Sequence, residues 1–342
     1  MDTVDTRGVE QWEKNLLAAL DGRKVDYLVV SHLEPDHAGS IGRLVELFPE
    51  VTLVGNAKTF HMLPQFFDEL PVDENHKITV AEGESLSLGT HTLNFYMAPM
   101  VHWPEVMVTY ESSEKILFSA DGFGKFGALS AEEEWTDEAR RYFINIVGKY
   151  GVQVQTLLKK AAALDIQTIC PLHGPILKDN LGFYIGKYLT WSSYEPEEDG
   201  VLVACASIHG NTKAAAEKMV EVLRANGASK VVFMDLTRDD MAEAVADAFR
   251  YGKIILAAAS YDAGVFPPME DFLHRLVHKN LQKSTFGLIE NGSWVPCAAR
   301  GMKGILEGMK EVNVCENVVS IKSTMKDTDV AKMEELAKEI LA

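Results

Sequence analysis

The hydrophobic pattern of the chain changes near residue 200. Beyond this point, short apolar runs alternate with stretches whose apolar residues recur at helical spacing. The pattern predicts strands at 201–206, 230–235, 253–260, 284–290 and 317–321, and helices at 212–226, 239–251, 268–280, 298–311 and 328–341. Strands that alternate with helices in this way are typical of a doubly wound α/β fold with a five-stranded parallel sheet. Such a sheet binds ligands at the carboxyl ends of its strands.

The first half mixes helices with strands in a less regular order. Helical spacing predicts helices at 9–20, 41–48 and 59–67, and predicts that the segment 132–164 is helical. Strands are predicted at 27–31, 51–54, 76–80, 92–96, 106–110, 116–120 and 168–170. This order favours an α+β fold in which two sheets pack together with helices outside. The polar, turn-rich stretch 191–200 predicts a linker between domains at 1–190 and 201–342.

Composition and charge narrow the possible functions. The chain has 342 residues, of which 47% are hydrophobic and 24% charged, as in globular proteins. Its net charge of −17 argues against nucleic acid or an anionic membrane as a partner. No apolar run reaches the length of a membrane-spanning helix, and no signal peptide is recognisable. The four cysteines contain no CxxC pair, which favours reduced thiols in a cytoplasmic protein and argues against a rubredoxin-type site.

Residues 32–37, His-Leu-Glu-Pro-Asp-His, form the most informative motif. They place four potential metal ligands directly after the predicted strand 27–31. Two imidazoles and two carboxylates within one turn would strain and desolvate one another unless a cation held them together. His102, Asp121 and His173 each lie at the end of a predicted strand, beside glycine or proline. Each of these three alone could be a turn residue, but together the seven residues predict a metal site.

A second candidate site follows the strands of the second half. Ser207-Ile208-His209-Gly210-Asn211-Thr212 resembles the flavodoxin phosphate loop, in which hydroxyl and N–H groups at a helix N-terminus bind phosphate. The loop lacks the paired glycines of a dinucleotide fingerprint, so it favours FMN over NAD or FAD, although it could merely cap a helix. The next loops are Ser260-Tyr261-Asp262-Ala263-Gly264 and Glu290-Asn291-Gly292-Ser293-Trp294. Tyr261 or Trp294 could stack on a flavin or be a buried edge aromatic.

The motif His32-x-Glu34-x-Asp36-His37, with His102, Asp121 and His173, resembles the metallo-β-lactamase-like superfamily and, within it, the flavodiiron proteins. Hydrolases of the superfamily carry His-x-His-x-Asp-His, so Glu34 stands where they have a second histidine. A carboxylate at this position hardens the ligand set and favours iron over zinc. The resemblance implies one iron bound by His32, Glu34 and His102, a second bound by Asp36, His37 and His173, and Asp121 as the bridge. It leaves open whether His37 is a direct ligand.

The same resemblance implies an αββα metallo-β-lactamase-like sandwich followed by a flavodoxin-like domain, with two iron ions and FMN as cofactors. We expect an oxidoreductase that reduces O2 to water or NO to N2O, with electrons passing through FMN. The expected electron donor is a separate rubredoxin-like protein or another flavoprotein. A head-to-tail homodimer, or a dimer of dimers, is expected as well. The family begins with strands that would precede residue 1, so we expect this chain to lack the first strands of the sandwich.

Two other functions stay open at this stage. A zinc hydrolase fused to a flavodoxin-like module would share most of the motif, although Glu34 argues against it. A non-catalytic electron carrier would bind FMN and keep the metal site only as a vestige. The ligands also leave the choice between O2 and NO open, because that choice depends on the groups around them.

Overall fold

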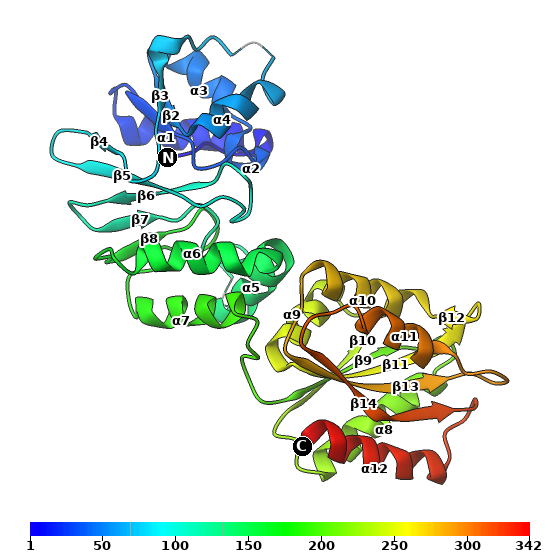
Figure 1. The fold of residues 1–342 in the computed structure, drawn as a ribbon. Coiled ribbons are helices and arrows are strands. Elements are labelled where there is room, and N and C mark those ends of the chain that lie inside the picture. Colours follow the sequence, from blue (N-terminus) through cyan, green and yellow to red (C-terminus); the bar gives the residue numbers. More distant parts are fainter. Residues whose placement is uncertain (69, 132) are drawn as a thin grey trace. The chain divides into compact units, whose positions relative to one another are not determined.

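The computed structural model describes residues 1–68, 70–131 and 133–342 and divides the chain into two compact units (Figure 1). Unit 1 comprises Met1–Glu133 and Val152–Gly186, and unit 2 comprises Glu134–Gly151 and Lys187–Ala342. Among the described residues, no helix is both long enough and apolar enough to cross a membrane. All four cysteines are described, and each is a free thiol.

Unit 1 contains two sheets that pack face to face. The first is parallel and has the order β1 (Tyr27–Val29), β2 (Thr52–Gly55) and β3 (Lys77–Thr79). The second has the order β4 (Ser85–Ser87), β5 (Thr92–Met97), β6 (Met107–Glu111), β7 (Ile116–Phe118) and β8 (Thr168–Cys170), and within it only β7 and β8 pair in parallel. Val29 and Val54 of the first sheet share a buried core with Phe95 and Met107 of the second. The apolar residues of the short strands therefore form the layer between the sheets.

Helices cover the outer faces of this sandwich. Leu28 and Val30, which point away from the second sheet, share a core with α3 (Ile41–Leu47) and with α1 (Val9–Leu20). The helix α6 (Gly151–Ala161) covers the second sheet, where the Lys160 ammonium donates a hydrogen bond to the Met97 carbonyl. The short helices α2 (Pro35–Ala38) and α4 (Ala57–Met62) follow β1 and β2. Unit 1 thus has the predicted αββα arrangement.

Unit 2 is built on a parallel sheet. Its strand order is β10 (Val231–Asp235), β9 (Val201–Ala206), β11 (Lys253–Tyr261), β13 (Ser284–Asn291) and β14 (Val312–Ile321), and the two-residue β12 (Gly264–Val265) pairs with β11. Helices α8 (Asn211–Ala225) and α12 (Asp327–Leu341) share the core on one face, and α9 (Met241–Tyr251), α10 (Pro267–His278) and α11 (Ala298–Leu306) cover the other (Figure 1). β9 lies inside the sheet between β10 and β11 and is completely buried, as its continuous apolar sequence requires. The predicted doubly wound sheet is confirmed.

The segment 132–164 is largely helical, as predicted, but its helical type changes along the chain. Residue 132 lies outside the described residues, and residues 135–161 form α5 (Trp135–Tyr142), a π-helical turn (Phe143–Val147), a 3-10 turn (Gly148–Tyr150) and α6. At Gly151, where α6 begins, a Cβ atom would lie 2.3 Å from the Ser192 carbonyl oxygen. Only glycine allows the backbone to pass so closely at this point.

The segment predicted as the linker 191–200 is held in place rather than free. Trp191 and Ser192 are buried and belong to α7 (Leu181–Ser192), which the sequence pattern did not predict. The carboxylate of Glu197 is paired with the guanidinium of Arg140 in α5, and both side chains are 3% exposed. Because of these contacts, the compact units have different boundaries from the predicted domains 1–190 and 201–342.

Candidate metal centre and flavin pocket

The structure brings all seven predicted metal ligands together in unit 1. His32 and Glu34 follow β1, His102 lies in the connection between β5 and β6, Asp121 follows β7 and His173 follows β8. Asp36 and His37 belong to α2, within the segment predicted as a loop. Ligand atoms lie within 4.8 Å of one another in three overlapping groups, which are His32, Glu34, His102 and Asp121; His32, Asp36 and His37; and His37, Asp121 and His173. The ends of four separate chain segments thus converge on one place.

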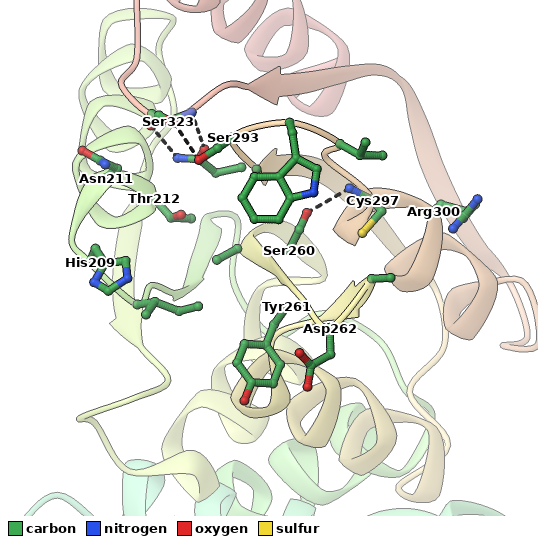
Figure 2. Close-up of a pocket in the computed structure, with 17 residues that line it drawn as sticks. His209, Asn211, Thr212, Ser260, Tyr261, Asp262, Ser293, Cys297, Arg300 and Ser323 are labelled. Carbon is green, nitrogen blue, oxygen red and sulfur yellow. Dashed lines mark hydrogen bonds between the residues drawn. The ribbon is translucent and has the colours of Figure 1, made fainter.

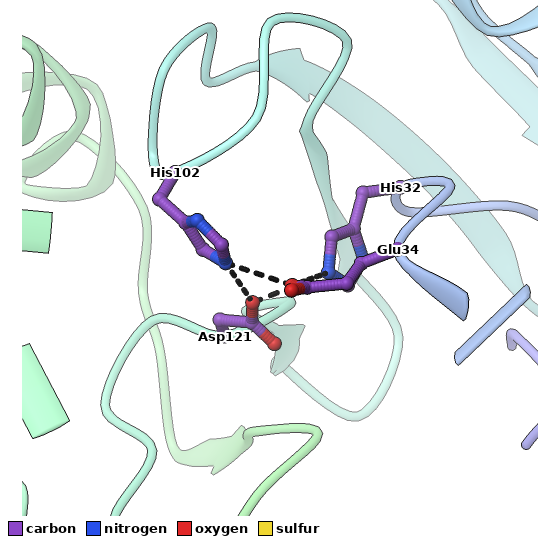
Figure 3. Close-up of side chains that lie close together, drawn as sticks. All are labelled: His32, Glu34, His102 and Asp121. Atoms are coloured by element: carbon purple, nitrogen blue, oxygen red, sulfur yellow. Dashed lines mark hydrogen bonds and ion pairs between the residues drawn. The ribbon is translucent and has the colours of Figure 1, made fainter. Parts of the chain in front are cut away.

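The first group surrounds one oxygen of Asp121 (Figure 3). The Nε2 atom of His102 lies 2.9 Å from Glu34 Oε2 and 3.1 Å from Asp121 Oδ2. The Nε2 atom of His32 lies 3.2 Å from the same Asp121 oxygen. His32 and Asp121 are buried, whereas Glu34 and His102 are partly exposed. Glu34 and His102 therefore form the solvent-exposed side of this group.

Asp36, His37 and His173 form a second ligand group beside the other oxygen of Asp121. The Oδ1 atom lies 3.6 Å from His37 Nε2 and 3.7 Å from His173 Nε2. These two nitrogens are 2.9 Å apart, and each lies 3.3 Å from Asp36 Oδ2. Asp121 therefore presents one oxygen to each group, as a carboxylate that bridges two metal ions would.

Opposite charges face one another at this site. Burial disfavours protonation of His32, but the carboxylates of Asp121 and Glu34 raise its pKa to about 10. Interactions with His102 and His32 lower the pKa of Glu34 to about 2. Burial of Asp121 is outweighed by the same two imidazoles, which hold its pKa below the usual range. Protons on the imidazoles thus balance the charge of the carboxylates when no metal is bound. Metal binding would release these protons and take over the charge balance.

Several buried atoms of the site have no hydrogen-bond partner among the described residues. They include both carboxylate oxygens of Asp121, Nε2 of His32 and Oδ1 of Asp36. Buried polar atoms without partners are rare in folded proteins and call for an explanation such as a bound ion. The seven ligands combine four imidazoles with three carboxylates, a mixture of borderline and hard donors that suits iron. The residues present therefore fit a pair of metal ions.

The first residues of the chain fix the backbone around the ligands. The Asp2 carboxylate accepts a hydrogen bond from the Ser31 N–H at 2.7 Å, and the Asp2 N–H donates to the Val29 carbonyl at 2.9 Å. Thr3 donates two hydrogen bonds to the His37 carbonyl, one from its N–H and one from its hydroxyl. The ligand-bearing segment is thus anchored at both ends.

A pocket of about 560 Å³ opens in unit 2 at the carboxyl ends of the strands (Figure 2). The predicted residues that line it are Ile208, His209, Asn211, Thr212, Ser260, Tyr261, Asp262, Ala263, Asn291, Gly292, Ser293 and Trp294. The predicted residues Ser207, Gly210 and Gly264 are not part of the lining. Ser207 instead supports the first loop, because its hydroxyl accepts a hydrogen bond from the Gly210 N–H.

The first loop of the pocket depends on the backbone of Gly210. This residue directly precedes α8 and has φ +91°, a left-handed conformation that favours glycine. No atom lies within 4 Å of the position that a Cβ atom would take there. The strain of a larger side chain at this position would therefore come from the backbone and not from a clash.

Hydrogen bonds connect the other loops of the pocket. The Asn291 side chain donates to the Ser323 carbonyl and accepts from the Ser323 N–H, at 2.9 and 3.0 Å. The Ser260 hydroxyl accepts from the Cys297 N–H at 2.9 Å (Figure 2). Trp294 is 86% exposed and Tyr261 is 45% exposed, so both aromatic rings can reach a ligand at the pocket mouth.

The sequence prediction missed part of the pocket lining, namely Ala259, Val295, Cys297, Arg300 and Ser323. Ser323 follows β14, so the rule that ligands bind at strand ends could have identified it. Cys297 and Arg300 reach the pocket from the start of α11. Nothing in their local sequence marks them as binding residues.

Characterised relatives match nearly the whole chain. It is 27% identical to the rubredoxin-oxygen oxidoreductase of Megalodesulfovibrio gigas, over 99% of this chain and 86% of that protein. It is 28% identical to the nitric oxide reductase of Moorella thermoacetica, over 100% of this chain and 87% of that one. Among solved structures, the rubredoxin oxygen:oxidoreductase from Desulfovibrio gigas superimposes with a TM-score of 0.88 at 25% identity, over 99% of this chain and 86% of that chain.

The flavodiiron protein from Giardia intestinalis has the same fold, with a TM-score of 0.87 at 23% identity, over 99% of this chain and 86% of that chain. The family model described as ODP family beta lactamase matches residues 2–174, just over half of the chain. The chain belongs to the flavodiiron proteins. All seven ligand candidates, from His32 to His173, lie inside the matched segment. The family predicted from the motif is thus confirmed, and the roles of the individual residues stay predictions.

Proposed function

We propose that this flavodiiron protein reduces O2 to water, NO to N2O, or both, at a diiron centre in unit 1, with electrons delivered through FMN in unit 2. The observation that carries the proposal is the position of Asp121, which turns one oxygen to each of two ligand groups. Two metal positions that share a carboxylate suit a small molecule held between two ions. The names of the relatives, an oxygen oxidoreductase and a nitric oxide reductase, support the two substrates.

In this proposal each ligand group of unit 1 holds one iron. His32, Glu34 and His102 would hold the first, Asp36, His37 and His173 the second, and Asp121 would join them. The irons would supply open coordination positions and the electrons that a diatomic gas requires. The chain selects iron through Glu34, since a zinc hydrolase of the superfamily would carry histidine there.

FMN would occupy the pocket of unit 2. The N–H groups at the start of α8, together with Asn211 and Thr212, would hold the phosphate with the help of the helix dipole. Tyr261 and Trp294 would flank the isoalloxazine ring, because both rings lie at the exposed mouth of the pocket.

We further propose a rubredoxin-like protein or another flavoprotein as the electron donor, and a head-to-tail homodimer or dimer of dimers as the active form. Rubredoxin is named in one of the relatives. The mouth of the flavin pocket exposes Trp294, Val295 and Tyr261, which is apolar surface that a second copy of the chain would cover. We also propose that the protein is located in the cytoplasm.

Metal analysis and gas consumption test the proposed function. Protein purified without oxygen and loaded with FMN should contain two irons per chain and should consume O2 or NO rapidly when reduced. Parallel kinetics with the two gases would establish which one is preferred. Zinc without iron in the purified protein would contradict the proposal, and so would a protein that binds iron and FMN but consumes neither gas.

Gly210→Val should weaken FMN binding by about tenfold or more. A left-handed conformation costs a residue with a Cβ atom about 1–2 kcal/mol, so the loop would leave the shape that receives the phosphate. Fluorescence titration with FMN measures the effect, and riboflavin, which has no phosphate, should bind both proteins almost equally. Gly227→Val is the matched control, because Gly227 follows the other end of α8 with the same φ of +91° and the same open surroundings. Equal weakening of FMN binding in both variants would contradict a phosphate-binding role for the loop.

A further inference from the structure

A buried carboxylate beside the metal ligands has no part in the ligand set. Glu105 lies three residues after His102 in the connection between β5 and β6, and it is 1% exposed. No lysine, arginine or histidine among the described residues forms an ion pair with it. A buried carboxylate without a cation is costly, so its presence at this place requires an explanation.

The contacts of Glu105 connect three segments near the metal ligands. Its Oε1 atom accepts a hydrogen bond from the Leu33 N–H at 2.8 Å, and Leu33 lies between the ligands His32 and Glu34. Its backbone carbonyl accepts from the Asn56 side chain at 2.6 Å. Asn56 in turn caps α4 through the N–H groups of Lys58 and Thr59. Glu105 thus fixes the peptide that carries two ligands relative to the loop that carries a third.

The second oxygen of Glu105 is the unusual feature. Oε2 is buried and has no hydrogen-bond partner among the described residues. The proposed ligands Glu34, Asp36 and Asp121 carry three negative charges, whereas two ferrous ions would carry four positive charges and two ferric ions six. A positive excess would therefore remain at the metal centre, and it would grow when the irons are oxidised.

We propose that Glu105 is a positioning residue of the metal centre, which holds the Leu33 peptide through one oxygen and supplies a compensating negative charge through the other. The proposal rests on the metal centre of the proposed function. Residues that orient ligands from outside the ligand set typically change metal affinity by about 10–100-fold. Glu105 combines such orientation with a charge that favours the oxidised irons over the reduced ones.

Two substitutions separate the two contributions. Glu105→Gln keeps an oxygen for the Leu33 N–H and removes the charge, so the dissociation constant for Fe²⁺ should rise about tenfold. Glu105→Ala removes both and should raise it about a hundredfold. Glu105→Gln should weaken the binding of the oxidised irons about tenfold more than the binding of the reduced irons. For a one-electron couple, this difference corresponds to a midpoint potential about 59 mV higher.

The experiment uses the full chain, with anaerobic Fe²⁺ titration against a competing chelator and a redox titration of the loaded protein. Glu111→Gln is the control, because Glu111 lies at the opposite end of β6 from Glu105, is 6% exposed, accepts N–H bonds from Ser113 and Glu114, and pairs with His91 rather than with the ligand segment. It should leave the iron affinity and the potential unchanged. Circular dichroism of the metal-free variants shows whether they are folded.

The possible outcomes are distinct. If the natural chain fails to bind two irons, the proposed function itself is wrong. If it binds them and Glu105→Ala binds them equally well, Glu105 is not a positioning residue. If Glu105→Gln matches the natural chain in affinity and potential, the charge contribution is refuted. A graded loss from the natural chain through Glu105→Gln to Glu105→Ala, with Glu111→Gln unaffected, supports both contributions.

Discussion

Replacement of Asp121 by alanine is expected to abolish gas reduction and to lower the iron content below two per chain. Asp121 is 1% exposed and contributes one oxygen to each ligand group, so its loss damages both metal positions at once. Removal of groups that only orient ligands costs about 10–100-fold in metal affinity or activity, and removal of the shared ligand should cost more than that. Iron analysis and O2 and NO consumption by the reduced protein measure the effect.

The control for this variant is Asp165→Ala, which removes a carboxylate that is 61% exposed and paired with Lys115 in the same unit. It should leave the iron content and the activity unchanged. FMN binding should be normal in Asp121→Ala, because the flavin pocket lies in unit 2. Gas consumption at the natural rate by Asp121→Ala would contradict the bridging role and favour a site in which Asp121 is only structural.

The same variant tests the proposed head-to-tail dimer. Asp121→Ala retains FMN, and Gly210→Val retains the metal centre. At an FMN concentration that fills the natural pocket but lies below the dissociation constant of Gly210→Val, each homodimer alone should have little activity. If the flavin of one chain serves the metal centre of the other, mixed dimers of the two variants should recover activity. No recovery after exchange of subunits, confirmed by mass measurement of the mixed dimer, would contradict electron transfer between chains.

Glu197→Ala is expected to destabilise unit 2 by about 3–5 kcal/mol, the usual cost of breaking a buried ion pair. The Glu197 carboxylate accepts hydrogen bonds from Arg140 at 2.5 and 3.0 Å, from Lys187 at 2.6 Å and from the Trp191 indole at 2.7 Å. Its removal leaves the guanidinium of Arg140 buried, with the largely exposed Asp137 as its other acidic partner. Denaturant unfolding followed by tryptophan fluorescence detects the change, because the rings of Trp135 and Trp191 stack 5.9 Å apart next to this pair.

The stabilisation by Glu197 should depend on pH in the acidic range. Burial alone would raise the pKa of Glu197, but Arg140 and then Lys187 and Trp191 lower it to about 2 from its ordinary value of 4.5. The contribution is therefore complete above about pH 4.5 and is lost as the pH falls towards about 2. Glu195→Gln is the matched control, since the Glu195 side chain is 55% exposed and its pairing with Lys283 should contribute less than about 1 kcal/mol. Equal effects of the two variants would contradict a special role for Glu197.

Much of the fold could be predicted because buried strands leave a clear pattern. The strand 201–206 agrees with β9 at both ends, since each of its residues is buried and apolar. The beginning of β14 at Val312 was missed, because exposed polar residues interrupt this strand, which lies at the edge of the sheet. β4, β12 and α2 contain two to four residues each, which is too short for a periodic signal.

Some residues of the two sites could also be predicted from the sequence, and others could not. The clustering of the candidate metal ligands could be predicted because histidine and carboxylates gather at strand ends, where their chemistry is unusual for a loop. Glu105 could not be predicted, because one glutamate in a loop has the sequence signature of a solvated side chain until its burial is known. Arg300 and Cys297 were missed because only the packing of α11 beside the strands brings them to the pocket.

The route of the chain between its units limits how the flavin-binding part can be moved from one protein to another. The chain passes between the units three times, at residues 133–134, 151–152 and 186–187. A fragment that begins at Val201 would resemble a complete flavodoxin in sequence, yet it would leave behind both Arg140 and Glu197. In gene fusions or domain exchange, unit 2 therefore cannot be transferred as one continuous segment of the chain. Residues 134–151 must be transferred together with the segment that follows residue 186.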